Sequence, residues 1–172
     1  MERTLSLNNN IVRIETKTTN GEKMHTALNL IQNIANTFDY NNELHWLIFD
    51  SDTIPQYESS FFSSGYHNPI TIGVKMDERN YLIQRFPEIL KVITDTILSP
   101  LGATNNTKNY IKFVILHEFG HFLDYRRGLS LGNPPFGIED FDNLYSYIIA
   151  YRNYPSERSA DDFVKEAWRK IG

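Results

Sequence analysis

The chain has 172 residues, of which 41% are hydrophobic and 13% aromatic, so it can bury a substantial core. Its formal net charge of −4 gives no basic footprint for nucleic acid or for an anionic membrane surface. The absence of cysteine excludes every metal site that contains a thiolate. No linker or repeat divides the chain, and we therefore expect residues 1–172 to form a single domain.

The first eight residues lack the apolar core of a signal peptide, and no apolar stretch reaches membrane-spanning length. These features predict a cytoplasmic protein by default. A mature secreted form remains an alternative, because a chain without cysteine suits any compartment. The oligomeric state stays open.

Hydrophobic periodicity over the first hundred residues predicts an alternation of strands and helices, and hence an α/β (α+β) fold. The expected elements are strand 11–16, helix 22–38, strand 44–49, strand 70–74, helix 78–85 and helix 88–98. The strand at 70–74 bears on function if it lies at a sheet edge, because an unpaired edge can pair with an extended peptide. A core strand is the equally open alternative.

The next expected helix, residues 109–127, is apolar almost all round, which predicts that it is buried. It contains His117-Glu118-Phe119-Gly120-His121, with two imidazoles one helical turn apart. Side chains at i and i+4 share a helix face about 5–6 Å apart, so both rings can reach one ion. Glu118 is displaced around the helix, where it fits better as the acceptor of a proton from a metal-held water than as a third ligand.

Gly120 stands in the interior of this helix, where glycine costs about 1 kcal/mol relative to alanine. Such a residue predicts that another backbone passes close by. After a loop at 129–137, we expect a tyrosine-rich helix at 141–152 and a last helix at 155–171.

Catalytic zinc usually has three protein ligands, so the histidine pair needs a partner. A third histidine six residues after His121 is excluded by Arg127, which leaves a carboxylate. The apolar stripe of the last helix also carries Glu157 and Asp161, and acids on a core-facing stripe need partners. A metal would satisfy Glu157, although a first-turn acid that complements the helix dipole is the alternative.

Asp161 would then orient His117 by accepting the N–H of its distal ring nitrogen, as acids beside metal-bound histidines commonly do. Asp162 lies on the opposite face of the same helix, and we expect it to be solvated.

These residues resemble zinc peptidases of the gluzincin type, in which a second helix supplies a glutamate ligand and an acid four residues later. The local match is to the ImmA/IrrE-like peptidase family, whose second helix reads Glu-x-x-Ala-(Asn or Asp)-x-Phe-Ala; residues 157–164 differ only in a final Val. Residues 117–124 are also similar to the active-site helix of lethal-factor-type metalloproteases. In those proteases the third ligand and the acid four residues later would correspond to Asp162 and Glu166. The apolar stripe of the helix argues against this assignment. The resemblance covers roughly residues 69–171.

The resemblance implies a zincin-like fold: a small mixed sheet with an edge strand above an active-site helix, followed by a ligand-bearing C-terminal helix. It also implies a zinc endopeptidase with Zn²⁺ on His117, His121 and Glu157 and with Glu118 as general base. The substrate would be a protein or peptide, with no nucleic acid or membrane as partner.

A phenol near the metal would stabilise the oxyanion, and Tyr151 and Tyr154, just upstream of the glutamate ligand, are the candidates. Either could equally be a packing residue. Two other functions stay open: a zincin-like binding module without turnover, and a zinc hydrolase that acts on a non-peptide amide.

Overall fold

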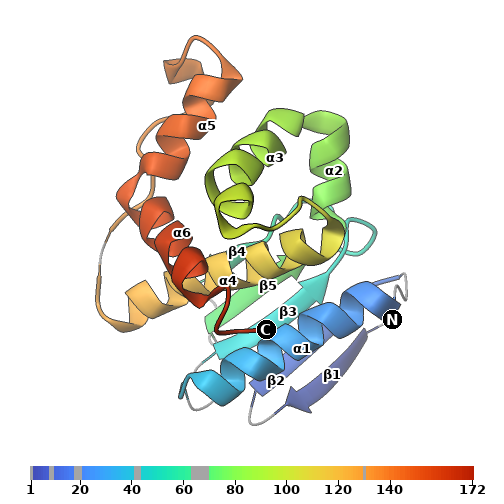
Figure 1. Ribbon diagram of the computed structural model, residues 1–172. Coiled ribbons are helices and arrows are strands. Elements are labelled where there is room, and N and C mark those ends of the chain that lie inside the picture. Colours follow the sequence, from blue (N-terminus) through green and yellow to red (C-terminus); the bar gives the residue numbers. More distant parts are fainter. Residues whose placement is uncertain (1, 8–9, 18–20, 41–43, 63–69, 130) are drawn as a thin grey trace.

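The computed structural model describes residues 2–7, 10–17, 21–40, 44–62, 70–129 and 131–172 (Figure 1). Within these ranges the chain forms a five-stranded mixed sheet and six α-helices. The mixed α/β class expected from the sequence is therefore confirmed. None of the described helices has both the length and the apolar character needed to cross a membrane.

The sheet has the spatial order β1-β2-β3-β5-β4. Its strands are β1 (Glu2–Leu7), β2 (Asn10–Glu15), β3 (Leu44–Phe49), β4 (Ser60–Phe62) and β5 (Ile70–Lys75). The three central strands are parallel, and β1 and β4 are antiparallel to their neighbours at the two ends of the order.

The sequence prediction missed both outer strands of this order. β1 is mostly exposed and polar, and β4 is only three residues long, so neither shows the alternation of a half-buried strand. The strand expected at 70–74 is β5, which pairs with β3 on one side and β4 on the other. Its interpretation as an edge strand is therefore wrong, and its core alternative holds. β4 lies at this edge of the sheet, and β1 lies at the opposite edge.

The helices agree with the expected pattern except at some ends. Their bounds are α1 (Gly21–Thr37), α2 (Glu78–Arg85), α3 (Pro87–Ile93), α4 (Thr107–Arg126), α5 (Leu144–Asn153) and α6 (Pro155–Ala167). The helix expected at 88–98 changes after Ile93 into a π-helical turn, Thr94–Leu98. The helix expected to reach residue 171 ends at Ala167. Ile171 is buried in the core as its place on the stripe suggests, but it lies after the turn that follows the helix.

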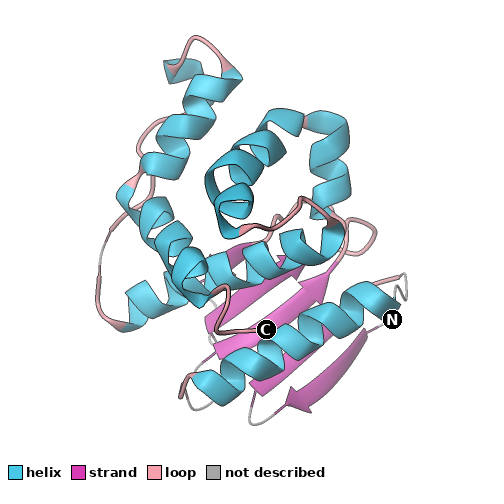
Figure 2. Ribbon diagram, viewed as in Figure 1, coloured by secondary structure: helices cyan, strands magenta, loops and turns pink. Residues whose placement is uncertain are grey.

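Helix α4 lies at the centre of the molecule. It shares one face of the sheet with α1, and α2, α3, α5 and α6 lie on its other side (Figures 1 and 2). Toward the sheet, the ring of Phe119 stacks on Trp46 with 6.3 Å between centroids. Toward the helical layer, α4 packs along α6. This position between two layers explains why α4 is apolar almost all round, and its expected burial is confirmed.

Edge strand β4 is held onto α4 by aromatic packing and by one half-buried carboxylate, that of Glu78. Phe61 packs against Phe122 and Tyr125 of α4, with centroid distances of 6.1 and 5.6 Å. Glu78 accepts a hydrogen bond from the Ser59 backbone N–H at 2.9 Å and another from the Tyr110 hydroxyl at 2.8 Å. The start of β4 is thereby tied to the first turn of α4.

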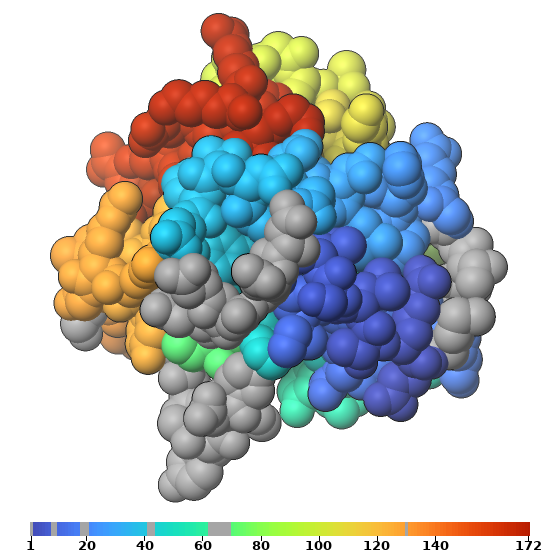
Figure 3. Space-filling model, turned by 90° about the horizontal axis from the view of Figure 1, so that it is seen from below, coloured from blue at the N-terminus to red at the C-terminus, as the bar shows by residue number. Residues whose placement is uncertain are grey.

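The C-terminal residues return to the sheet layer beside α1. The Asn33 side-chain amide donates to the backbone carbonyl of Gly172 at 2.8 Å. Figure 3 shows the C-terminal surface adjoining α1 on this side of the molecule. The segment after α6 is thus anchored, which limits how far α6 can shift along α4.

Gly120 is the point of closest approach between α4 and α6. A Cβ atom placed on Gly120 would lie 3.0 Å from the Cα of Ala160 and 3.4 Å from its Cβ. The expectation that another backbone passes this glycine is therefore confirmed. The contact sets the spacing between the two helices within one turn of each of their candidate ligands.

We expect Gly120→Ala to destabilise the protein by about 1 kcal/mol and to weaken metal binding. The overpacking cost of about 1–3 kcal/mol exceeds the roughly 1 kcal/mol that alanine adds to helix stability, and it forces α6 away from α4. Urea unfolding and a metal titration would measure both effects. Gly21→Ala is the matched control, because no atom of the described residues lies within 4 Å of its added Cβ. Equal stability and metal affinity in Gly120→Ala would show that the close approach constrains neither.

Candidate metal centre

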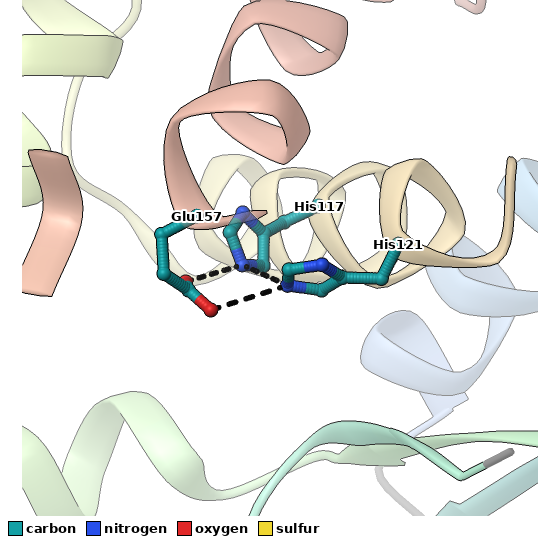
Figure 4. A group of neighbouring side chains, drawn as sticks. All are labelled: His117, His121 and Glu157. Atoms are coloured by element: carbon teal, nitrogen blue, oxygen red, sulfur yellow. Dashed lines mark hydrogen bonds and ion pairs between the residues drawn. The ribbon is translucent and has the colours of Figure 1, made fainter. Parts of the chain in front are cut away.

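Two helices bring three potential metal ligands together (Figure 4). His117 and His121 come from α4, and Glu157 comes from the first turn of α6. His117 Nε2 lies 3.1 Å from Glu157 Oε2 and also 3.1 Å from His121 Nε2. His121 Nε2 lies 3.4 Å from Glu157 Oε1. This buried cluster could hold a metal ion.

The chemistry of the cluster fits a small divalent cation. Ligand atoms at 2.0–2.1 Å from a tetrahedral ion are about 3.3 Å from one another, close to the separations in this cluster. Two imidazole nitrogens that face each other at 3.1 Å cannot both present lone pairs without a proton or a cation between them. The donor set of two imidazoles and one carboxylate is one that divalent transition metals accept.

Asp161 orients His117 by a hydrogen bond on the side of the ring that faces away from the other two ligands. His117 Nδ1 donates to Asp161 Oδ1 at 3.0 Å, and both side chains are buried. Because a carboxylate only accepts, this bond keeps a proton on Nδ1, so Nε2 is the nitrogen that faces Glu157 and His121 and that a metal would bind. The structure therefore brings Asp161 to the position that the stripe of α6 predicts.

Arg152, at the end of α5, is a member of the site that sequence reasoning missed. Its Nε donates to Asp161 Oδ2 at 3.1 Å, and its Nη2 donates to Asp161 Oδ1. Its Nη1 lies 3.6 Å from Glu157 Oε2. In the sequence it is only a basic residue in the last turn of a helix, a common position explained by the helix dipole. No spacing signal distinguishes it.

Glu118 is buried next to the cluster. Burial raises its pKa to about 8, and the charge of Glu157 adds to this rise while His117 opposes it. A carboxyl group with a pKa near neutrality can both accept and return a proton at physiological pH. The role of general base expected of Glu118 from the sequence stays a prediction.

The two candidate tyrosines occupy different surroundings. Burial raises the pKa of Tyr151 above its usual range, and the negative charge of Glu157 raises it further, so its phenol stays protonated. Tyr154 packs its ring on Phe136, with 6.1 Å between centroids. Its hydroxyl lies 3.5 Å from the Cβ position of Gly132, in the loop between α4 and α5.

The two acids of the alternative assignment of the third ligand, Asp162 and Glu166, face solvent. Asp162 is exposed on α6, with an oxygen 3.7 Å from Lys165 Nζ. Glu166 is also exposed and pairs with Lys170 at 3.2 Å. Both carboxylates lie on the solvent face of α6, as the stripe predicts, whereas Glu157 lies on the face that meets α4.

Metal affinity is expected to rise with pH. Burial lowers the pKa of His117, but its hydrogen bonds to Asp161 and Glu157 outweigh this and raise the pKa to about 9 in the metal-free protein. At pH 7 this imidazole is therefore protonated, and a metal must displace its proton. Affinity should increase about tenfold per pH unit and level off above the pKa of His117. Calorimetric titration in two buffers of different protonation enthalpy would count the released proton. Constant affinity between pH 6 and 8 would contradict this prediction.

Comparison with known proteins finds no relative of this chain: no family model, no curated protein and no solved structure matches it.

Proposed function

We propose that this protein is a zinc-dependent endopeptidase of the gluzincin type. One observation carries the proposal: His117, His121 and Glu157 converge from two helices, and a buried carboxyl group, Glu118, lies beside them. A site that only bound zinc would not need an additional acid of raised pKa next to its ligands. Zinc is favoured over other divalent ions by the combination of two imidazoles with one carboxylate.

A bound zinc ion would lower the pKa of a water molecule toward neutrality and polarise the scissile carbonyl. Glu118 takes the proton of the attacking water and hands it to the leaving amine. Asp161 keeps the ring of His117 in the tautomer that binds metal. The protonated phenol of Tyr151 donates a hydrogen bond to the oxyanion.

The same proposal assigns the substrate to the edge of the sheet. Among the described strands, β4 has a neighbour on one side only, β5. Its Phe61 packs on the half of α4 that follows the histidine pair. An extended peptide that adds to this edge would run over α4 and place its backbone carbonyls near the metal centre. In this proposal the fold is zincin-like, with β4 as the edge strand above the active-site helix.

The decisive experiment is cleavage of an unbiased peptide library by the zinc-loaded protein, compared with Glu118→Gln protein. Products identified by mass spectrometry would give the cleaved bonds. Cleavage that depends on both zinc and Glu118 is the expected result. Failure to cut any peptide while zinc is fully loaded would overturn the proposal in favour of a non-peptide amide substrate or a binding role.

A further inference from the structure

Two buried carboxylates of α6 lie one helical turn apart, next to the histidine pair. The side chains of Glu157 and Asp161 are only 9% and 7% exposed. Like charges at i and i+4 repel each other, and buried charges without a counter-ion are strongly destabilising. The ring of His117 is paired with both acids but can balance only one of these charges, so a second cation must compensate the other before any metal arrives.

Arg152 supplies this cation from a different helix, α5. Its side chain is 14% exposed. The guanidinium donates hydrogen bonds to both oxygens of Asp161 through Nε and Nη2, and its Nη1 lies toward Glu157. The group also lies over the ring of Phe113 on α4, 5.4 Å from the centroid. One side chain thus connects α5 to both acids of α6 and rests on α4.

The geometry of these contacts requires the guanidinium in particular. A planar group with several fixed donors can hold both oxygens of one carboxylate and approach a second at the same time. A lysine ammonium is a compact point charge on a flexible stem and cannot reproduce this arrangement. Asp161, once held, keeps His117 Nδ1 at 3.0 Å.

We propose that Arg152 is a positioning residue that assembles the metal centre in the metal-free protein. Its charge takes the place of part of the metal's charge, holds Asp161 against His117 and keeps Glu157 directed at the two imidazoles. The fold of α5 and α6 is then largely independent of metal, and the ligands are preorganised for binding. This inference rests on the metal centre and not on peptide hydrolysis.

The test combines thermal unfolding with zinc titration of the full chain. Arg152→Met should lower the unfolding midpoint of the metal-free protein by about 10 °C, because Asp161 loses its counter-charge. Zinc affinity should fall about tenfold, as is typical when a group that orients ligands is removed. At the same zinc concentration, zinc should raise the midpoint of the variant by less than it raises that of the wild type, because the stabilisation by a ligand grows with its affinity. Arg158→Met, at an exposed arginine on α6, is the control and should change neither quantity.

A double-mutant cycle with Asp161→Asn separates the ion pair from simple packing. In the Asp161→Asn background, Arg152→Met should lower the midpoint by much less than in the wild type. Arg152→Lys should recover part of the midpoint but little of the zinc affinity, and it keeps the test usable if Arg152→Met fails to fold.

An equal loss of midpoint in both backgrounds would overturn the inference, because Arg152 would then act through its contact with Phe113. Unchanged zinc affinity in Arg152→Met would overturn it as well. None of these measurements involves peptide cleavage. A protein that binds zinc but cuts no peptide would refute the proposed endopeptidase and leave the role of Arg152 standing.

Discussion

Glu157→Ala is expected to reduce zinc affinity by more than the roughly 10–100-fold that is typical of residues that only orient ligands. The substitution removes one of three protein ligands, and two imidazoles alone do not complete a catalytic zinc site. Hydrogen bonds to His117 and His121 hold the pKa of Glu157 well below its usual range, although burial acts in the opposite direction. The carboxylate is therefore ionised and available at any physiological pH. Competition against a chromogenic chelator would measure the affinity.

Asp162→Ala is the matched control for this prediction. It removes an acid from the same helix, but from the exposed face, where the carboxylate pairs with Lys165. We expect its zinc affinity to equal that of the wild type. If both variants retained zinc equally, Glu157 would not be the third ligand. A loss confined to Asp162→Ala would support the lethal-factor-type register instead.

Glu118→Gln should reduce peptide hydrolysis by about 10²–10⁴-fold without loss of zinc. The amide has nearly the size of the carboxyl group but cannot accept the proton of the attacking water. Because Glu118 is not among the three clustered ligands, the metal content should stay the same. Initial rates on a cleaved library peptide, measured together with zinc content, would separate loss of chemistry from loss of metal.

Glu166→Gln serves as the control for this second prediction, since it makes the same chemical change at an exposed position of α6. It should leave the rate unchanged. Full activity in Glu118→Gln would exclude Glu118 as general base. If instead Glu118→Gln protein keeps its biological effect while no peptide is cut by the wild type, the chain acts as a binding module.

Local sequence patterns predicted those parts of the site that lie along one helix. The spacing of His117 and His121 places both rings on one face of α4, and the apolar stripe of α6 assigns Glu157 and Asp161 to its inner face. The same reasoning placed Asp162 in solvent, where the structure has it. Each of these conclusions follows from the 3.6-residue period of a helix, which is a property of the local chain.

What the sequence by itself determined is thus the secondary structure of most of the chain, the burial of α4 and the inner face of α6. Only the tertiary structure decided that β4 rather than β5 lies at its end of the sheet, and that Arg152 of α5 holds the acids of α6. Strand order and contacts between helices depend on how distant segments pack, and neither an isolated arginine nor a three-residue strand carries a periodic signal. Gly120 stands between the two cases: its cost within a helix indicated a close neighbour, but only the packing of α6 on α4 identified that neighbour as Ala160.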